Sequence, residues 1–586
     1  MSSLILLALA PLVVFAVARP VPAAKRTKGQ DSELRSTIEQ FWADQGNLDR
    51  VYVVRYSATR RKRLTDFYRS VLADLKKRDF SSMGEEGQAD YVLLRNTCER
   101  RISDLDNEAR DEGKYTKLIP FAKAITGLDE ARRRMEPVDP EKAATIMNAM
   151  DKEIKALAPR IGDAPPAKGG DNAKPAADRL RSSKFEGNQA ALAVKTLRDT
   201  LKTWFAFYEG YDPLFSWWCE APYKVVDKEM ETYSGVLKEK LVGVKPDDEN
   251  AIVGNPIGRE ALIDALKYEM IPYTPEELLK IADEEYAWCL AEMKKAAKDL
   301  VYGDDWKKAL EHVKDLHVEP GKQPQMIREL ALEAIKYVKD HDLVTVPPLA
   351  EESWRMDMMT PERQLVSPFF LGGETILVSY PTNTMAHEAK LMSMRGNNRY
   401  FSRATVQHEL IPGHHLQGYS QARYMPYRRG FGTPFWTEGW ALYWEMLLWD
   451  LGFAKTPEEK IGMLFWRMHR CVRIQFSLQF HLGKLTPEQC IDMLVDKVGH
   501  ERANAEGEVR RSFNGSYPPL YQAAYMLGGL QIRAMHHELV DSGKMTNRDF
   551  HDAILHENNM PIEVLHAILT KEKLTTDYAT HWRFRG

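Results

Sequence analysis

Apolar residues recur at intervals of three and four along most of the chain, with charged residues between them. The stretches DSELRSTIEQFWAD and ALIDALKYEM show this pattern, which is typical of amphipathic α-helices. Three segments also begin with Thr-Pro-Glu followed by Glu or Gln, starting at Thr274, Thr456 and Thr486. Each supplies an N-cap, a proline for the first helical position and a side chain that can complete a capping box. The sequence therefore predicts a mainly α-helical protein.

Strand signals are few. The clearest is FFLGGETILVSYPT, from Phe369 to Thr382, where a Gly-Gly turn leads into a β-branched run. This stretch comes shortly before a histidine-rich motif. We therefore expect one small β-sheet beside the site that the motif forms.

A tract rich in Pro, Gly and Ala covers residues 159–177 and predicts a linker. It separates an N-terminal helical region, residues 31–158, from a helical catalytic region, residues 178–586. At the start of the chain, an apolar run from Leu4 to Ala18 is short for a membrane span and ends in small residues. We interpret residues 1–24 as a signal peptide and expect a periplasmic or secreted protein. An uncleaved N-terminal anchor is the alternative, because no Lys or Arg precedes the apolar run.

The composition excludes some classes of protein. The 586 residues include 44% hydrophobic ones, enough for a large core, and the 81 basic and 84 acidic residues nearly cancel. A near-neutral chain has no global field for polyanions, so nucleic acid is not an expected partner. No later segment is apolar enough to cross a membrane. The five cysteines are scattered, without a Cys-x-x-Cys pair, and predict neither a disulfide framework nor a sulfur-rich metal site.

The motif QHELIPGHHLQ contains the candidate chemistry. On a regular helix, two histidines share a zinc ion when they are four residues apart. His414 is six residues after His408 and faces another way, whereas His415 is seven residues after it and about 10.5 Å along the axis. Pro412 and Gly413 resolve the difficulty, because proline disrupts the helix and glycine tolerates the deviation. We expect a bulge that returns His414 to a position near His408.

A third ligand is expected on a later helix. The segment TPFWTEGWALYWEMLLWDLG is apolar on all sides, so its carboxylates Glu438 and Glu445 would be buried and need partners. They are seven residues apart and share a helix face. We predict Glu438 as the metal ligand and Glu445 as the carboxylate that orients a ligating imidazole. Alternatively, Glu438 is a helix-start acid capped by Thr437, and Glu445 pairs with an arginine such as Arg467.

The motif HELIPGHHLQ resembles the His-Glu-x-x-Pro-Gly-His-x-x-Gln motif of the bacterial family known as domain of unknown function 885, generally regarded as metallopeptidase-like. The motif residues fall on His408, Glu409 and His414, and His415 occupies an open position. Further blocks of the family occur here in the same order: YEGYDPLFSWWCEAP, IPYTPEELLKIADEEY, YPTNTMAHEAKLMSMRGNNRYF, TPFWTEGWALYWEMLLWDLG and PPLYQAAYMLGG. The resemblance implies a large helical zinc-peptidase-like (gluzincin) architecture with a deep cleft, similar to angiotensin-converting enzyme and the Taq carboxypeptidase group.

These residues together predict an exported zinc metallopeptidase that acts on short peptides and holds one zinc ion per chain. Glu409 is the expected general base for a metal-activated water. In VRRSFNGSYPPLYQAAYMLGG, Tyr525 matches the family's tyrosine and is the expected oxyanion donor, with Tyr521 as the alternative and a core position as the simpler reading. We also assign Arg510 and Tyr521 to substrate binding.

Two other functions use the same residues. One is a zinc amidohydrolase that acts on a non-peptide amide or ester, and the other is a non-catalytic binding protein stabilised by a metal. Glu409 favours an enzyme, because a purely structural metal needs ligands but no neighbouring base. Arg395 and Arg399 could hold a peptide carboxylate, although salt bridges are their simpler role. Nothing in the sequence predicts an oligomeric state.

Overall fold

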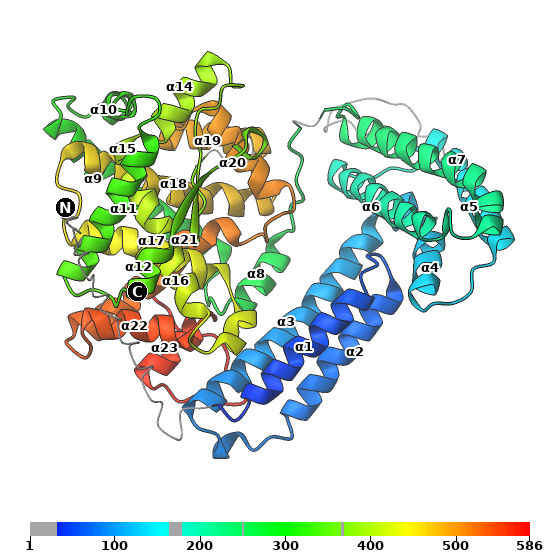
Figure 1. Ribbon diagram of the computed structural model, residues 1–586, viewed down its shortest axis with the longest axis horizontal. Helices are drawn as coiled ribbons and strands as arrows, with labels where there is room; N and C mark the ends of the chain where they lie inside the picture. Colours follow the sequence, from blue (N-terminus) through cyan, green and yellow to red (C-terminus); the bar gives the residue numbers. More distant parts are fainter. Residues whose placement is uncertain (1–31, 163–178, 249–250, 365–368, 586) are drawn as a thin grey trace, which may run out of the picture.

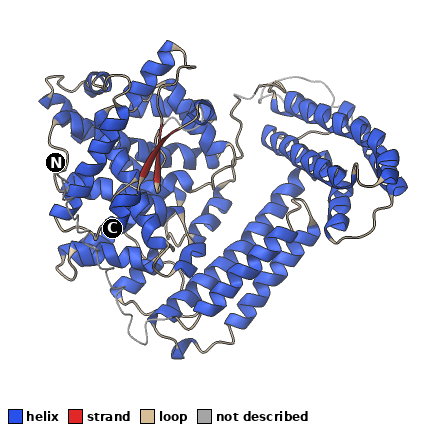
Figure 2. Ribbon diagram, viewed as in Figure 1, coloured by secondary structure: helices blue, strands red, loops and turns tan. Residues whose placement is uncertain are grey.

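The computed structural model describes residues 32–162, 179–248, 251–364 and 369–585, and it is mainly helical (Figures 1 and 2). Within these ranges the one sheet consists of β1 (Arg355–Met358) and β2 (Thr375–Val378), which pair in parallel with Arg355 opposite Thr375. The prediction of a mainly helical fold with one small sheet is therefore confirmed. The predicted signal peptide, residues 1–24, and most of the predicted linker lie outside the described residues.

Three long helices run side by side at the start of the described chain: α1 (Arg35–Val51), α2 (Ala58–Leu75) and α3 (Glu85–Tyr115) (Figure 1). Their apolar residues belong to the same hydrophobic core as those of the C-terminal half. A buried arginine, Arg428, joins the two parts, because its guanidinium contacts Asp90 at 2.7 Å, Glu86 at 2.6 Å and Glu557 at 2.5 Å. The first three helices are therefore fixed to the C-terminal region.

A second, smaller core lies between α4 (Ala122–Arg133), α5 (Pro140–Leu157), α6 (Lys184–Tyr208) and α7 (Pro213–Leu237). Helix α5 comes before the predicted linker, whereas α6 and α7 follow it, and α7 packs against both. Helices from both sides of the predicted linker, residues 159–177, therefore share this core. A Pro- and Gly-rich composition carries no information about which helices pack together.

The remaining helices surround the histidine motif. They are α8 (Arg259–Tyr268), α9 (Pro275–Asp299), α10 (Trp306–Asp315), α11 (Gln323–Asp340), α12 (Pro348–Ser353), α13 (Pro361–Gln364), α14 (His387–Gly396), α15 (Arg399–Glu409), α16 (His414–Gln421), α17 (Pro434–Asp450), α18 (Pro457–His481), α19 (Pro487–Val498), α20 (Arg502–Phe513), α21 (Tyr521–His536), α22 (Asn547–Glu557) and α23 (Ile562–Thr570). Short 3-10 helices are η1 (Phe80–Ser82), η2 (Thr116–Leu118), η3 (Ala158–Arg160) and η5 (Pro426–Phe431), and π-helical turns are η4 (Lys238–Val242) and η6 (His537–Asp541).

The three predicted capping boxes are confirmed. Helices α9, α18 and α19 begin at the prolines that follow Thr274, Thr456 and Thr486, and each threonine hydroxyl accepts a hydrogen bond from the backbone three residues on. In return, the Glu or Gln at that position accepts a hydrogen bond from the backbone of the threonine. Local sequence is therefore sufficient to place these helix starts.

Helix α17 lies almost entirely inside the protein and packs along α21. The two helices approach closely at Gly439 and Gly528: a Cβ atom on Gly439 would lie 2.5 Å from the carbonyl carbon of Gly528. Helix α18 in turn packs against α9, α15 and α21, and the rings of Phe401 and Phe465 stack between α15 and α18 with centroids 4.3 Å apart. These contacts hold α15, α17, α18 and α21 together around the histidine motif.

All five cysteines are buried and none forms a disulfide. Among the helices of the described ranges, none combines the length and apolar character needed to span a bilayer.

Candidate metal centre

The chain interrupts its helix within the histidine motif. Helix α15 ends at Glu409 and α16 begins at His414, so the motif consists of two helices joined by a tight turn. We predicted a bulge within one continuous helix, and that detail is wrong. The Gly413 N–H donates to the Gln407 carbonyl at 3.0 Å, and the indole of Trp440 donates to the Pro412 carbonyl at 2.9 Å. The turn is thus folded back onto α15 and held there from α17.

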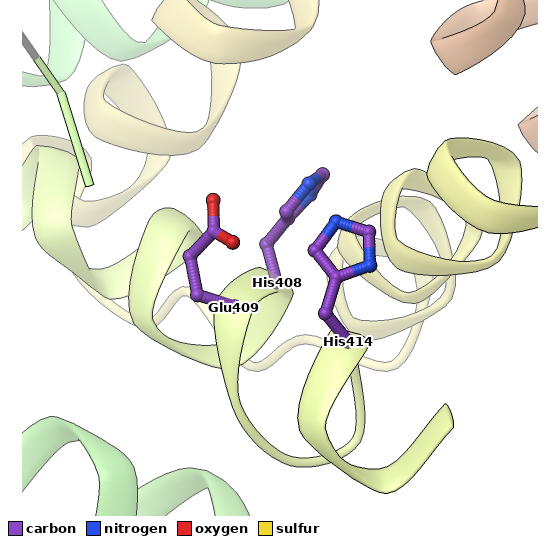
Figure 3. A group of neighbouring side chains, drawn as sticks. All are labelled: His408, Glu409 and His414. Atoms are coloured by element: carbon purple, nitrogen blue, oxygen red, sulfur yellow. The ribbon is translucent and has the colours of Figure 1, made fainter. Parts of the chain in front are cut away.

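Only glycine fits at position 413. A Cβ atom there would lie 1.9 Å from the carbonyl oxygen of His408. Because the side chain is absent, α16 can start directly beside the end of α15. The imidazoles of His408 and His414 consequently approach each other, with ring centroids 4.8 Å apart and planes at 88°. Figure 3 shows that they project to the same side as the carboxylate of Glu409.

Glu438, in the second turn of α17, faces the two imidazoles. Its Oε2 atom lies 3.3 Å from Nε2 of His414 and 3.7 Å from Nε2 of His408. Ligands of a tetrahedral zinc ion, each about 2.1 Å from the metal, are about 3.4 Å apart. The Oε2 atom is also buried without a hydrogen-bond partner. Two imidazole nitrogens and one unpartnered carboxylate oxygen therefore fit a zinc ion in both spacing and chemistry.

Glu409 is a second carboxylate in the same group. Its oxygen lies within 4.8 Å of nitrogens of both histidines. Glu409 is half-buried, whereas Glu438 is buried and its Oε2 atom has no hydrogen-bond partner. Glu438 is therefore the better third ligand, and Glu409 is left beside the ligand set with access to solvent.

Glu445 fixes the orientation of His408. The ring nitrogen Nδ1 of His408 donates to Oε1 of Glu445 at 2.7 Å, so Nε2 is the nitrogen that faces Glu438, 3.7 Å from its Oε2 atom. The alternative partner for Glu445, Arg467, instead pairs with Glu285 at 3.0 Å. The N-cap of α17 is Thr433, so Glu438 is not a capping acid beside Thr437.

His414 has its own positioning residue, Gln417, three residues later on α16. Nδ1 of His414 lies 3.3 Å from Oε1 of Gln417, whose amide nitrogen donates to the backbone of α17. Sequence reasoning missed this role, although a spacing of three on a helix could have suggested it. His415 points elsewhere: its Nε2 donates to the Ala350 carbonyl at 2.7 Å.

The charged groups of the site shift one another's pKa values. Burial lowers the pKa of His408, but the carboxylates of Glu438 and Glu445 outweigh it and raise the value to about 9. Burial would raise the pKa of Glu438, yet the two imidazoles hold it well below its ordinary range. For Glu409, burial raises the pKa and the imidazoles oppose it only in part. The ligand carboxylate is thus ionised, whereas Glu409 is nearer to its protonated form.

Both predicted tyrosines lie at this site. The Tyr521 hydroxyl donates to Oε1 of Glu438, the oxygen that faces away from the imidazoles. The Tyr525 ring stacks at 18° to the His408 ring, with centroids 6.1 Å apart. Burial and the Glu438 carboxylate raise the pKa of Tyr525 to about 12, so its hydroxyl keeps its proton at neutral pH. Tyr525 can therefore serve as a hydrogen-bond donor next to the candidate metal.

Arg510 does not belong to this group. It lines a separate cavity of about 630 Å³ together with residues of α3 and α6. The adjacent residue, Arg511, faces the tyrosines instead, with its guanidinium carbon 5.4 Å from the Tyr517 ring centroid. Neighbouring residues on a helix point about 100° apart, so Arg510 and Arg511 have different surroundings. Arg470, like Arg473, reaches Tyr525: its guanidinium carbon lies 4.4 Å from the ring centroid. No sequence signal distinguished it.

The remaining predicted features surround the site. Arg395 pairs with Glu311 and Asp315, and Arg399 pairs with Glu329 at 3.2 Å, so both form salt bridges. The loop before β2 touches Glu409, because the Gly373 N–H donates to the Glu409 carbonyl at 3.3 Å. The small sheet thus lies beside the histidine motif, as we predicted.

Comparison with known protein families matches residues 44–569 to the family described as bacterial protein of unknown function, DUF885. The chain belongs to the DUF885 family. The match covers every residue of the candidate metal centre and the helices of both cores, apart from the first part of α1 and the last residue of α23.

The DUF885 chain is similar to two solved structures. A protein of Shewanella oneidensis, described as a "putative lipoprotein of unknown function", has a TM-score of 0.67 and 17% identity and covers 92% of this chain and 100% of its own. A "putative lipoprotein" of Colwellia psychrerythraea has a TM-score of 0.49 and 18% identity, covering 74% and 77% respectively. The first similarity shows a shared fold. No curated protein matches the chain.

Proposed function

We propose that this DUF885 protein is an exported zinc metallopeptidase that hydrolyses short peptides and binds one zinc ion per chain through His408, His414 and Glu438. The observation that carries this proposal is the Oε2 atom of Glu438, which is buried, has no hydrogen-bond partner and lies 3.3 and 3.7 Å from the two imidazole nitrogens. A buried carboxylate oxygen without a donor is costly, and a cation between these three atoms removes the cost.

The residues around the ligands have complementary roles. A zinc ion held there would lower the pKa of a water molecule and polarise the scissile carbonyl. Glu409 lies beside both histidines, and its raised pKa suits a group that accepts a proton from water and later passes it to the leaving amine. Tyr525 donates a hydrogen bond to the developing oxyanion. We assign this role to Tyr525 because the Tyr521 hydroxyl is already engaged with Glu438.

The proposal also includes the architecture of the protein and its location outside the cytoplasm. Two histidines at a helix end, with a carboxylate ligand from a later helix, are the arrangement expected of a helical gluzincin with a deep cleft. Glu409 and His414 are half-buried while His408 and Glu438 are buried, which leaves one open side for a short peptide. Export to the periplasm or the medium is supported by the apolar run from Leu4 to Ala18 and by the description of the Shewanella relative as a lipoprotein.

Metal analysis and one substitution test this function. The purified protein should contain about one zinc ion per chain. Glu409→Gln should keep that zinc and lose roughly 10²- to 10⁴-fold in peptide hydrolysis, since it removes the base but no ligand. The matched control is Glu388→Gln, which alters another His-Glu pair on the exposed start of α14 and should change nothing.

Two results would contradict the proposal. One is a protein that holds no zinc and gains none when zinc is added. The other is full activity of the Glu409→Gln variant. A panel that includes non-peptide amides and esters separates a peptidase from an amidohydrolase that uses the same residues.

A further inference from the structure

A buried arginine next to the candidate metal centre has no counterion. Arg470, on α18, is only 6% exposed. No residue of the described ranges forms a hydrogen bond or an ion pair with it, and its Nε atom is buried without a partner. Two aromatic rings lie next to it: the guanidinium carbon is 4.4 Å from the Tyr525 ring centroid and 5.5 Å from that of Trp466. The charge of Arg470 is therefore uncompensated by any direct contact.

The surroundings of Arg470 are rich in positive charge. Arg473, one turn later, lies 4.6 Å from the same Tyr525 ring centroid. A single carboxylate, Glu508, serves both Arg473 at 2.8 Å and Arg511 at 3.3 Å. Of three neighbouring guanidinium groups, two thus share one carboxylate and the third, that of Arg470, has none. We call Arg470, Arg473 and Arg511 the arginine cluster.

Two buried histidines beside the arginine cluster carry no charge. His469 and His500 are hydrogen-bonded to each other at 2.7 Å between ring nitrogens. Burial lowers the pKa of His500 to about 3 and that of His469 well below its ordinary value, so both rings are neutral at physiological pH. The cluster consequently keeps its excess of positive charge.

The arginine cluster faces the candidate metal centre. The Tyr525 ring lies between Arg470 and His408, 4.4 Å from the guanidinium carbon and 6.1 Å from the imidazole centroid. Glu409, Glu438 and Glu445 are near enough for their charges to interact with that of Arg470. Glu438 and Glu445 are already paired with the histidines, however, and burial together with Arg473 still lowers the pKa of Arg470. The surroundings therefore disfavour the charged form of Arg470 unless another anion lies beside it.

An uncompensated buried charge is among the most destabilising groups in a protein interior, and a well-packed apolar residue of similar size would cost less. Arginine is suited to a carboxylate, since its planar group binds both oxygens at once. A ligand carboxylate that enters next to the metal centre would supply the missing charge. Because an extended chain advances about 3.3 Å per residue, a carboxylate bound next to the metal centre belongs to a residue one or two positions from the scissile bond.

We propose that Arg470, supported by Arg473 and Arg511, binds the C-terminal carboxylate of the substrate, so that the protein is a carboxypeptidase that removes one or two residues. This inference rests on the proposed function. The bond that breaks is the amide C–N bond one or two residues before the C-terminus. Water supplies the oxygen of the new carboxyl group and the proton that the amine takes up, so the reaction needs no other reactant.

Matched peptides test the inference. Short peptides of mixed sequence are offered as free acids and as C-terminal amides, and the products are identified by mass spectrometry. The wild-type protein should release one or two residues from the acids, with kcat/KM for the amides lower by at least about 30-fold, as expected for loss of one buried charge pair. Arg470→Met should cleave acids and amides equally. The control is Arg533→Gln. Arg533 is on α21 and pairs with Asp450, so this variant should keep the preference for free acids.

A bound inorganic anion would give a different result. If Arg470 held chloride, the wild-type protein would cleave acids and amides alike and would lose activity when gluconate replaces chloride. That outcome would overturn the inference. A structural role predicts a lower melting temperature for Arg470→Met, whereas removal of an uncompensated charge predicts an equal or higher one. A lower melting temperature together with an unchanged acid preference would also overturn the inference.

A measurement of peptide binding tests the carboxylate site separately from peptide hydrolysis. The zinc-loaded Glu409→Gln variant is titrated with acetyl-Ala-Ala-Ala and with its C-terminal amide in a calorimeter. Tighter binding of the acid, lost in the Glu409→Gln, Arg470→Met double variant, supports the carboxylate site even if no peptide is hydrolysed. Hydrolysis of acids and amides at equal rates would leave the peptidase in place and remove only the carboxypeptidase.

Discussion

Nδ1 of His408 donates a hydrogen bond to Oε1 of Glu445 at 2.7 Å, between two buried side chains from different helices. The bond orients the ring so that Nε2 of His408 is directed at Glu438, 3.7 Å away. Glu445 also sits two helical turns beyond Glu438 on α17, so one helix provides both the candidate ligand and the group that orients another ligand. The rigidity of α17 therefore sets the geometry of the metal centre.

The first prediction concerns this pair. Glu445→Gln keeps the shape of the side chain but removes the charge that supports the His408 tautomer, so zinc affinity should fall by roughly 10- to 100-fold. Competition with a chromogenic chelator measures this change, and circular dichroism checks that the fold is kept. An unchanged affinity would show that His408 needs no charged partner.

The two adjacent histidines should behave differently. His414→Ala should abolish zinc binding, because it removes a nitrogen 3.3 Å from Glu438. His415→Ala should keep the zinc, because its ring is bonded to the Ala350 carbonyl. The zinc content of the two variants is compared after dialysis. Loss of zinc from His415→Ala alone would show that the wrong histidine of the pair was assigned.

Stability should depend on pH through Glu508. Burial alone would raise the pKa of Glu508, but Arg473 and Arg511 outweigh it and lower the value to about 2 from an ordinary 4.5. A lowered folded-state pKa stabilises the protein above pH 4.5, and this contribution is lost as the pH falls toward 2. Glu508→Gln should therefore cost roughly 3 kcal/mol at pH 7 and progressively less below pH 4.5.

Chemical denaturation at a series of pH values measures this difference. The control is Glu488→Gln, whose ion pair with Arg502 is on the surface and should contribute little at any pH. A constant difference between the Glu508 variant and the wild type across the acid range would contradict the assignment.

The contact between α17 and α21 should tolerate no side chain at position 439. Gly439→Ala would place a Cβ atom 2.5 Å from the Gly528 backbone and should destabilise the protein by about 1–3 kcal/mol or more, through overpacking. It should also weaken zinc binding, because Glu438 is the preceding residue. Gly418→Ala in α16 meets nothing within 4 Å and should be neutral or slightly stabilising. Equal melting temperatures for the two variants would mean that α17 can move away from α21.

The local parts of this structure could be predicted from the sequence. The capping boxes at Thr274, Thr456 and Thr486 place helix starts correctly, because the interacting groups are three residues apart. The spacing of His408 and His414 around Pro412-Gly413 indicated a broken helix, although the structure forms two helices where we expected a bulge. The positions of Glu438 and Glu445 followed from the cost of burying carboxylates on an apolar helix.

The sequence by itself determined the helices, the order of the candidate ligands and the residue types that suit zinc, since each depends on short-range geometry or on the chemistry of one side chain. Only the tertiary structure decided that Arg511 rather than Arg510 faces the tyrosines, that Gln417 orients His414, and that Arg470 lies uncompensated beside Tyr525. These relationships depend on how α18, α20 and α21 are rotated and packed against one another. Residues distant along the chain set that packing, and no local pattern specifies it.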